Sequence, residues 1–222
     1  MIVVHHLDHS RSQRILWLLE ELGVPYEVKR YARDKKTMLA PQALKDVHPL
    51  GKAPVITDGS RTVAESGAIL EYLVDTYGGG RLRPREGTEE HLRYRHWMHY
   101  AEGSAMPPLL LRLVANRIAS APVPFFVKPV TKRIAGQLES GFIGPQIKTH
   151  FDFVESELGK GEWLAGDELT AADVQMSFPL EAAVDRADVG NGRPRIRAFV
   201  ERVKARDAYK RAEEKGGGFG IL

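Results

Sequence analysis

The chain has 222 residues, a length that suits one large domain or two small ones. Its hydrophobic (43%) and charged (27%) residues are in the proportions of an ordinary globular protein, and no apolar run is long enough to cross a bilayer. The formal charge is only +3, and acids lie among the basic residues near the C-terminal end, so we expect no nucleic-acid partner. The chain has no cysteine, which excludes disulfides, thiolate metal sites and a cysteine nucleophile.

The N-terminal end of the sequence shows no export signal. Met1 to Ser10 has neither the basic start nor the long apolar stretch of a secretory signal peptide. We therefore expect a cytoplasmic location. Because the chain has no thiol of its own, any sulfur chemistry must use a sulfur that a ligand brings.

The first part of the chain alternates between strand and helix patterns. Ile2 to Val4 is a short β-branched run typical of a buried strand, and apolar residues then recur at helical spacing from Arg11 to Leu22. The turn residues Asp58-Gly59-Ser60 separate two further β-branched runs and predict a hairpin. In chain order we expect a strand at 2–4, a helix at 11–22, a strand at 26–31, a short helix at 38–45, strands at 55–57 and 62–64, and a helix at 66–77.

A stretch rich in Gly and Pro follows and predicts a boundary between two domains. Residues 79–87 have no hydrophobic periodicity, which is typical of a linker. We therefore expect an N-terminal domain at 1–78, a linker at 79–87 and a second domain at 88–222.

The second domain has helical patterns throughout. Thr88 is placed to cap its first helix, and long helices return from Thr131 to Leu158. Between them, Pro107-Pro108 and the Pro-containing residues 121–124 are expected to interrupt the helices, because proline lacks the backbone donor that a helix needs.

The segment His9-Ser10-Arg11-Ser12-Gln13-Arg14 lies where the first strand gives way to the first helix. Ser10 and Gln13 have the spacing of a capping box, in which the two side chains satisfy backbone donors at the start of a helix. A helix N-terminus that carries hydroxyl groups is also a favourable site for an anion. The two roles are compatible, because a serine can accept a hydrogen bond with its oxygen and still donate its proton.

Other junctions also carry polar residues. Lys52-Ala53-Pro54 ends a tight loop before a strand, although the sequence does not determine whether the bond before Pro54 is cis. Ala64-Glu65-Ser66-Gly67 joins a strand to a helix, where Ser66 fits the N-cap position. Thr170 and Asp173 have the spacing of a further capping box, which we interpret as structural.

A metal site is an alternative interpretation of the N-terminal segment. His5, His6, Asp8 and His9 carry groups that bind zinc or nickel. However, His5 and His9 would share a face only on a helix, and this segment is predicted as a strand that leads into a turn. Since no second cluster supplies the remaining ligands, we expect no metal.

In their order and spacing, several segments resemble the glutathione transferases, most closely the yeast-type branch shared by fungi and bacteria. They are VHHLDHSRSQRILWLLEELGVPYE, HPLGKAPVI, AESGAI, YAEGSAMPPL, FDFVESEL and LTAADVQMSFPL, which span nearly the whole chain. The resemblance implies an α/β thioredoxin-like N-terminal domain followed by an all-α C-terminal domain, in a homodimer. It also implies glutathione as co-substrate, a small hydrophobic electrophile as second substrate, and a role in detoxification.

The resemblance further implies how glutathione is held. Lys52 would contact the glycyl carboxylate, and the backbone of Ala53, before a cis Pro54, would pair with the cysteinyl backbone. Glu65 would hold the γ-glutamyl ammonium group and Ser66 the γ-glutamyl carboxylate. The absence of cysteine excludes the related classes that form mixed disulfides with glutathione.

The sequence does not identify the group that activates the glutathione thiol, because His9 occupies the position at which the family has its activating serine. Ser10 is the nearest hydroxyl and Ser12 lies further into the helix, so both are candidate catalytic residues beside His9 and backbone donors. We favour Ser10, which an N-cap position would place at the mouth of the helix. Lowering a thiol pKa from about 8.5 to about 6.5 needs roughly 2.7 kcal/mol, which one charged hydrogen bond (about 1.5–3 kcal/mol) and a helix end can supply without a general base.

Two other functions remain open on this reasoning. One is a binding module that holds glutathione or another ligand without transferase turnover. The other is a glutathione-dependent peroxidase, which would use the same thiolate against a hydroperoxide.

Overall fold

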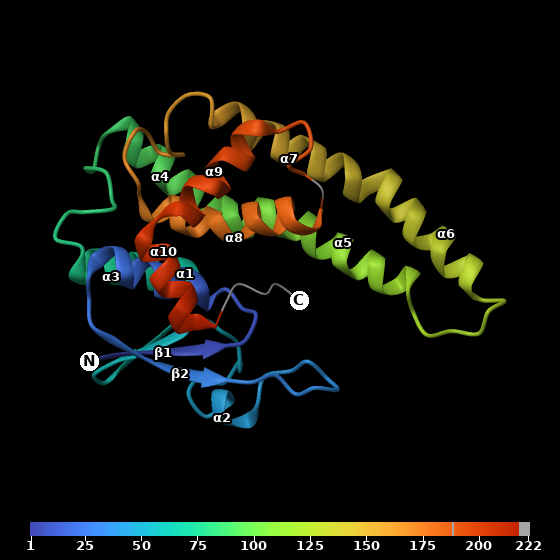
Figure 1. Cartoon of the computed structure of the whole chain (residues 1–222), viewed down its shortest axis with the longest axis horizontal. Coiled ribbons are helices and arrows are strands. Elements are labelled where there is room, and N and C mark those ends of the chain that lie inside the picture. The colour runs from blue at the N-terminus through green and yellow to red at the C-terminus, as the bar shows by residue number, and fades with distance from the viewer. Residues whose placement is uncertain (188, 218–222) are drawn as a thin grey trace.

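The computed structural model describes residues 1–187 and 189–217 (Figure 1). Its first part comprises β1 (Ile2–Leu7), α1 (Ser12–Leu22), β2 (Tyr26–Tyr31), α2 (Gln42–Lys45), β3 (Val55–Asp58), β4 (Arg61–Ala64) and α3 (Ser66–Tyr77). The predicted order of strands and helices is confirmed. The expected helix at 38–45 is shorter, because Met38 has a φ of 60° and so cannot belong to a right-handed helix.

The four strands form one mixed sheet in the order β2-β1-β3-β4. β1 and β2 are parallel and are connected through α1, whereas β3 and β4 form the predicted hairpin. The hairpin turns at Gly59-Ser60, where Gly59 takes the positive φ of 58° that a tight turn needs. β1 also pairs antiparallel with β3, and His5 lies opposite Val55. This register brings the end of β1 beside the loop that leads into β3.

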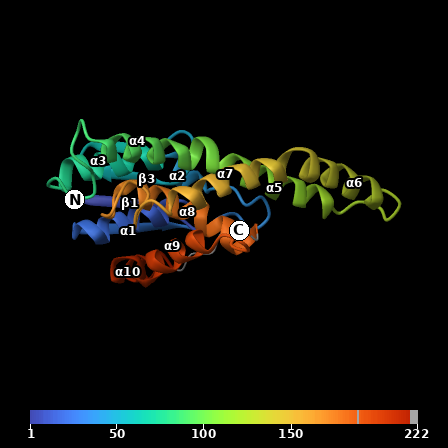
Figure 2. The same ribbon diagram turned by 90° about the horizontal axis from the view of Figure 1, so that it is seen from above.

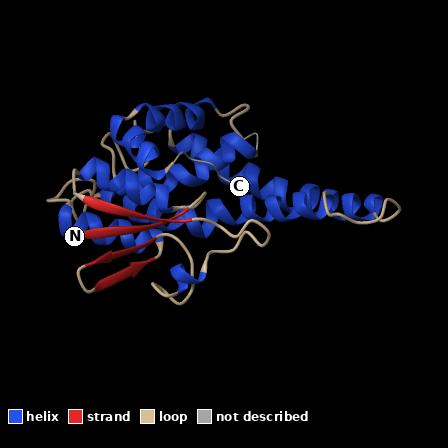
Figure 3. Ribbon diagram, turned by 60° about the horizontal axis from the view of Figure 1, so that its bottom comes forward, coloured by secondary structure: helices blue, strands red, loops and turns tan. Residues whose placement is uncertain are grey.

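Helices cover the two faces of the sheet unequally (Figure 3). On one face the short α2 packs, where Leu44 meets Leu7 and Tyr31. On the other face α1 and α3 lie between the sheet and the helices of the second part. A single hydrophobic core runs through that face into the helical part, and Trp17 of α1 packs edge-on against Tyr209 of the C-terminal helix α10 (Asp207–Gly216). The two parts are therefore held together by shared apolar side chains.

The second part is entirely helical among the described residues. Its elements are α4 (Glu89–Tyr100), the π-helical turn η1 (Ala101–Ala105), α5 (Met106–Ala119), α6 (Lys128–Leu138), the π-helical turn η2 (Glu139–Ile143), α7 (Gly144–Glu157), α8 (Ala171–Arg186), α9 (Pro194–Ala205) and α10 (Asp207–Gly216). The paths α4-η1-α5 and α6-η2-α7 lie side by side, and the α5–α6 end projects beyond the rest of the molecule (Figure 2). Residues 79–87, before α4, contain neither helix nor strand.

The expected interruption at Pro107-Pro108 is wrong. Both prolines lie in the first turn of α5, where a missing N–H group is tolerated, and η1 connects that turn directly to α4. Residues 121–124 do separate two helices, since they lie in the loop between α5 and α6.

Two predicted helix caps are confirmed. The Thr88 hydroxyl accepts a hydrogen bond from the His91 amide at 3.2 Å. At the start of α8, the Thr170 amide and hydroxyl both donate to Asp173 at 2.8 Å, which completes the capping box. Burial raises the pKa of Asp173 to about 6, although these hydrogen bonds oppose the shift. None of the helices described here combines the length and the apolar character that a membrane-spanning segment needs.

Candidate functional site

A cavity of about 230 Å³ opens beside the start of β3 and the junction between β4 and α3. It brings together the four residues predicted to hold glutathione, which come from two separate loops: Lys52, Ala53, Glu65 and Ser66. Its other lining residues are Arg11, His48, Leu50, Pro54, Ala64 and Glu102. The sheet register explains the arrangement, because β3 and β4 are neighbours and their two loops open at the same end.

The loop before β3 contributes a backbone edge and a cation to this cavity. The bond between Ala53 and Pro54 is cis, as the family resemblance implies. Ala53 is half-buried and lines the cavity directly before Val55, the first residue of β3. Lys52 is exposed, so its ammonium group is free to meet a carboxylate at the outer end of the cavity.

Glu65 and Ser66 occupy the junction between β4 and α3. Glu65 has φ 72° and ψ 126°, a strained backbone conformation for a residue with a side chain. It is the N-cap of α3, and Ser66 is the first residue of the helix, so the expectation that Ser66 caps α3 is wrong by one position. The reason is that Glu65 has a positive φ, which is incompatible with a right-handed helix, so helical geometry begins only at Ser66.

The buried Ser66 hydroxyl is oriented by a buried cation, Arg14 of α1. The Arg14 guanidinium donates to Ser66 Oγ at 2.9 Å and to Glu102 Oε1 at 2.6 Å. It also donates to the carbonyl oxygen of Gln175 in α8 at 2.6 Å. Because Ser66 Oγ accepts from Arg14, the serine proton is available for an acceptor in the cavity. A carboxylate is the acceptor that this charged neighbourhood favours.

Glu102 of η1 lines the cavity and is also bonded to Arg14. Arg11 also donates to both Glu102 oxygens, at 3.0 and 3.1 Å, so one carboxylate is shared by two arginines. Burial would raise the pKa of Glu102, but the charges of Arg14 and Arg11 outweigh it and lower the pKa. Burial lowers the pKa of Arg14 to about 10, which leaves it charged at neutral pH. The three groups together therefore carry one positive charge that a bound anion can neutralise.

The start of α1 differs from its expected form. The N-cap is Arg11 rather than Ser10, and helix α1 begins at Ser12. His9 has a φ of 53°, so the chain turns there and helical geometry starts only at Arg11. The predicted capping box is wrong, because the side-chain amide of Gln13 has no hydrogen-bond partner within the described part of the chain, and the Gln13 backbone amide donates to the Ser10 carbonyl oxygen instead of the Ser10 hydroxyl. Ser10 Oγ instead accepts weakly from the Ser12 amide, at 3.3 Å.

A chain of hydrogen bonds leads from Ser10 into the core. Ser10 Oγ lies 2.6 Å from Ser12 Oγ, which in turn lies 2.8 Å from Nδ1 of the buried His6. Burial and the nearby Arg30 lower the pKa of His6, while Asp8 and a hydrogen bond to the Gly216 backbone raise it. A neutral His6 that donates to Gly216 presents Nδ1 as an acceptor, so Ser12 donates to His6 and Ser10 donates to Ser12. In this state the Ser10 proton points toward Ser12.

A second cavity, of about 280 Å³, lies between the start of α1 and helices α5 and α8. Its lining is mostly apolar: Met106, Leu109, Leu110, Leu113, Phe178, Ala182 and Ala187, with His9, Arg11, Arg112 and Asn116. Arg11 is the single residue common to the linings of both cavities, and its guanidinium lies 5.2 Å from the Phe178 ring centroid. The polar cavity and the apolar cavity therefore adjoin at the guanidinium group of Arg11.

Comparison with known proteins identifies the family. Models of the glutathione S-transferase N-terminal and C-terminal domains match residues 1–75 and 144–207. Glutathione S-transferase 3 of Schizosaccharomyces pombe is 37% identical over 217 residues, which cover 97% of this chain and 88% of the relative. The chain belongs to the glutathione S-transferase family. Glutathione S-transferase 1 of Saccharomyces cerevisiae is 31% identical, with 99% of this chain and 97% of that enzyme covered.

A solved member of the glutathione S-transferase family has the same fold. The enzyme from Actinobacillus pleuropneumoniae is 33% identical, with a TM-score of 0.78 over 100% of this chain and 95% of that one. The predicted fold is therefore confirmed: a thioredoxin-like N-terminal domain followed by an all-helical C-terminal domain. The resemblance to the yeast enzymes is confirmed as well.

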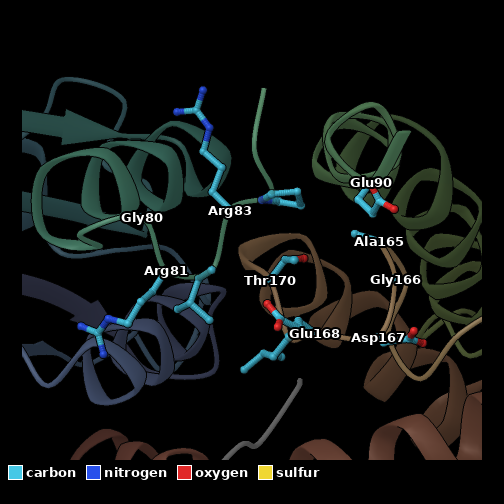
Figure 4. Close-up of a pocket in the computed structure, with 12 residues that line it drawn as sticks. Gly80, Arg81, Arg83, Glu90, Ala165, Gly166, Asp167, Glu168 and Thr170 are labelled. Atoms are coloured by element: carbon cyan, nitrogen blue, oxygen red, sulfur yellow. The ribbon is translucent and has the colours of Figure 1, made fainter. Parts of the chain in front are cut away.

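A third cavity lies apart from this glutathione transferase site, and two of the histidines near the N-terminus, His5 and His6, are hydrogen-bonded within the protein. A cavity of about 320 Å³ lies between residues 80–84 and residues 165–170, and none of the predicted site residues lines it (Figure 4). His5 is hydrogen-bonded to Tyr31 at 2.8 Å, and His6 to Ser12. Within residues 1–187 and 189–217, no three metal-binding side chains gather in one place.

Sequence reasoning missed three of the charged residues of the site: Arg11, Arg14 and Glu102. Of these three residues, Arg14 had the clearest signal in the sequence, because a cation on the apolar face of a helix needs a buried partner. Glu102 lies in the segment YAEGSAMPPL, which carried part of the family resemblance without a role for this carboxylate. Its pairing with α1 joins residues 88 positions apart and has no local signal.

Proposed function

We propose that this enzyme adds the glutathione thiolate to small apolar electrophiles, as a step in detoxification. The observation that carries the proposal is the pair of adjoining cavities. One has the charged and hydrogen-bonding groups that glutathione needs, the other has an apolar lining, and Arg11 lies where they meet.

The proposed roles of the binding residues follow their chemistry. Lys52 binds the glycyl carboxylate as a flexible point charge, and the Ala53 backbone pairs with the cysteinyl backbone. Glu65 binds the γ-glutamyl ammonium group. Ser66 donates to the γ-glutamyl carboxylate, which is supported by its acceptance of a hydrogen bond from Arg14. The unbalanced positive charge of Arg11, Arg14 and Glu102 also favours an anionic ligand.

We propose that Ser10 donates a hydrogen bond to the thiolate and that Ser12 holds the Ser10 side chain in place. Ser10 is half-buried, whereas Ser12 is fully buried and bonded to His6. To donate to sulfur, the Ser10 proton must turn away from Ser12, while the Ser12 amide continues to position its oxygen. The thiol proton leaves to solvent, and Arg11 adds a positive charge to the same region. No separate general base takes part.

The proposal includes the setting of the enzyme. The glutathione-binding domain spans 1–78, the linker 79–87 and the helical domain 88–222, and the enzyme acts as a cytoplasmic homodimer without a metal. Sedimentation at micromolar concentration tests the assembly, since a 24.8 kDa species alone would exclude a dimer.

The central test is the pH dependence of thiolate absorbance for glutathione bound to two serine variants. Ser10→Ala should raise the pKa of bound glutathione by about one to two units, at 1.36 kcal/mol per unit. Its conjugation rate near neutral pH should fall by a similar number of decades, with little change in glutathione affinity. Ser12→Ala is the matched control and should stay within a few-fold of the parent enzyme.

Three outcomes would contradict parts of this proposal. A normal profile in Ser10→Ala with a shifted profile in Ser12→Ala would reverse the two roles. Normal profiles in both would assign the thiolate to His9, Arg11 or backbone donors. Glutathione binding with no conjugation of a chlorinated nitroaromatic and no reduction of an organic hydroperoxide would indicate a binding module.

A further inference from the structure

The tip of the α5–α6 hairpin carries a surface that the proposed function does not use. The hairpin projects beyond the rest of the molecule, and residues 120–127 form the loop at its end (Figures 1 and 2). Phe125 and Phe126 in this loop are 83% and 68% exposed, and their rings meet edge-on with centroids 5.6 Å apart. Two adjacent aromatic rings left in water on a convex tip indicate a contact surface.

The apolar surface continues from the tip along α6. Phe126, Val130, Ile134 and Leu138 follow one another at intervals of four residues, and all four side chains are exposed. Side chains at this spacing lie on one side of a helix. The helix packs against α5 by another side, on which Ala135 is buried. α6 therefore presents an apolar stripe outward instead of hiding it in the core.

Positive charge surrounds this stripe. From Gly103 to Leu138 the sequence contains no Asp or Glu, but it contains Arg112, Arg117, Lys128, Lys132 and Arg133. Arg112 is paired with Glu139 at the base of α6. The other four are exposed, and none forms an ion pair with the part of the chain that the structure describes. The tip is thus both apolar and cationic, in a protein whose charges otherwise nearly balance.

We propose that this tip docks on the surface of a lipid bilayer that contains anionic headgroups. Phe125 and Phe126 would enter the boundary between headgroups and acyl chains, and the four cations would face the headgroups. A second copy of the chain that met this tip with its own tip would fit it less well. A contact between identical tips would place the same cations opposite each other, where they repel.

Docking would also bring the apolar cavity close to the bilayer. α5, which forms one side of the hairpin, lines that cavity with Leu109, Leu110 and Leu113. Apolar electrophiles concentrate in membranes, so the tip would hold the cavity near their source. The docking itself rests on the hairpin alone and holds whether or not the enzyme has the proposed transferase activity.

Vesicle flotation of the whole protein tests the proposal. The protein should float with vesicles of phosphatidylcholine mixed with phosphatidylglycerol, and much less with phosphatidylcholine alone. Binding should weaken as salt is added. The double variant Lys132→Gln, Arg133→Gln should bind roughly 25-fold more weakly, since each cation near an anionic surface contributes about fivefold. Phe125→Ser with Phe126→Ser should weaken binding by about tenfold or more per buried ring.

Matched controls lie elsewhere on the surface. Lys35→Gln with Lys36→Gln removes two exposed cations from the loop after β2, and Leu92→Ser removes an apolar side chain of α4 that is 62% exposed. Both should float like the parent. Phe126→Trp should keep binding and show a blue-shifted emission that brominated lipids quench, because the native tryptophans are all buried.

Three results would overturn the proposal. The first is equal flotation with neutral and anionic vesicles, and the second is flotation that the tip variants do not change. The third is a change of oligomeric state in Phe125→Ser with Phe126→Ser, since that would make the tip an interface between two copies. Conjugation of a water-soluble electrophile by the tip variants should equal that of the parent, which separates docking from the activity.

Discussion

The start of α1 and the tip of the α5–α6 hairpin are both rich in cations but use them in different ways. At the start of α1, Arg14 is buried and Arg11 half-buried, and both are bonded to Glu102. At the tip, Lys132 and Arg133 are exposed and form no ion pair within the described residues. The first region therefore has a fixed geometry suited to one small ligand. The second offers charge without fixed geometry, which suits a large and fluid surface.

The difference has an energetic basis. Burying a charge is unfavourable unless hydrogen bonds and an opposite charge compensate it, so a buried arginine fixes its neighbours. An exposed lysine keeps its hydration and its side-chain freedom, so it contributes little to folding and remains free to bind. Four predictions test this contrast, in order of decreasing effect.

Removing the shared carboxylate should have the largest effect. Glu102→Ala leaves Arg14 buried without its counter-charge, and breaking a buried pair in this way lowers the free energy of unfolding by about 3–5 kcal/mol. We expect the lower end of that range, because Glu102 is 34% exposed. Denaturant unfolding measures the loss. Glu86→Ala, which removes one of the two carboxylate partners of Arg83 at the surface, should change the free energy of unfolding by less than about 1 kcal/mol. Equal losses in the two variants would contradict the contrast.

Ser66→Ala tests the ligand side of the same network. It removes a hydrogen bond to a carboxylate, worth about 1.5–3 kcal/mol, so glutathione should bind roughly 10- to 150-fold more weakly. The free energy of unfolding should also fall, by about 1–3 kcal/mol, because one N–H group of the buried Arg14 loses its acceptor. Titration calorimetry measures the affinity, and Ser60→Ala in the β3–β4 turn is the control. Unchanged affinity in a folded Ser66→Ala protein would show that the site has been misplaced.

The buried carboxyl of Glu181 has no cation bonded to it among the described residues and should make stability depend on pH. Glu181 Oε2 accepts from the Tyr209 hydroxyl at 2.8 Å, and burial raises the pKa of Glu181 to about 8. Between its unfolded pKa and this value, the folded state binds more protons, so the free energy of unfolding falls as pH rises, by up to about 1.4 kcal/mol per unit. Above the pKa of Asp173, which is about 6, Glu181→Gln should remove this slope up to about pH 8, whereas the exposed Glu201→Gln should not. A slope that persists in Glu181→Gln would assign it to another group.

The smallest effect should come from the hairpin tip. Phe125→Ser and Phe126→Ser remove exposed side chains, so each should change the free energy of unfolding by no more than about 0.5 kcal/mol. Thermal unfolding without lipid measures this change. A loss above that value would mean that the two rings stabilise the fold, and the contrast with the start of α1 would then weaken.

The order of the elements could be predicted because it depends on local signals. The alternation of apolar residues, the Gly59-Ser60 turn and the capping box of Thr170 and Asp173 all lie within short stretches of sequence. Positions at the ends of elements were less predictable. Ser10 and Ser66 were each expected at an N-cap, and the structure gives that position to Arg11 and Glu65. In each case a residue with positive φ shifts the start of the helix, and a side chain gives no reliable sign of such a turn.

The thioredoxin-like fold with its helical partner, the absence of a cysteine nucleophile and four residues that line the proposed glutathione cavity (Lys52, Ala53, Glu65 and Ser66) could all be predicted from the sequence. Which of the charged groups are bonded to each other depends on the tertiary structure. Arg14 meets Ser66, Glu102 and Gln175 because α1, α3, η1 and α8 converge on it, and these residues are far apart along the chain. The same holds for the tip, since only the fold shows that the apolar stripe on α6 is exposed to solvent instead of buried in the core. Local patterns set the elements, whereas burial, which depends on the whole fold, sets what each charge and each apolar side chain can do.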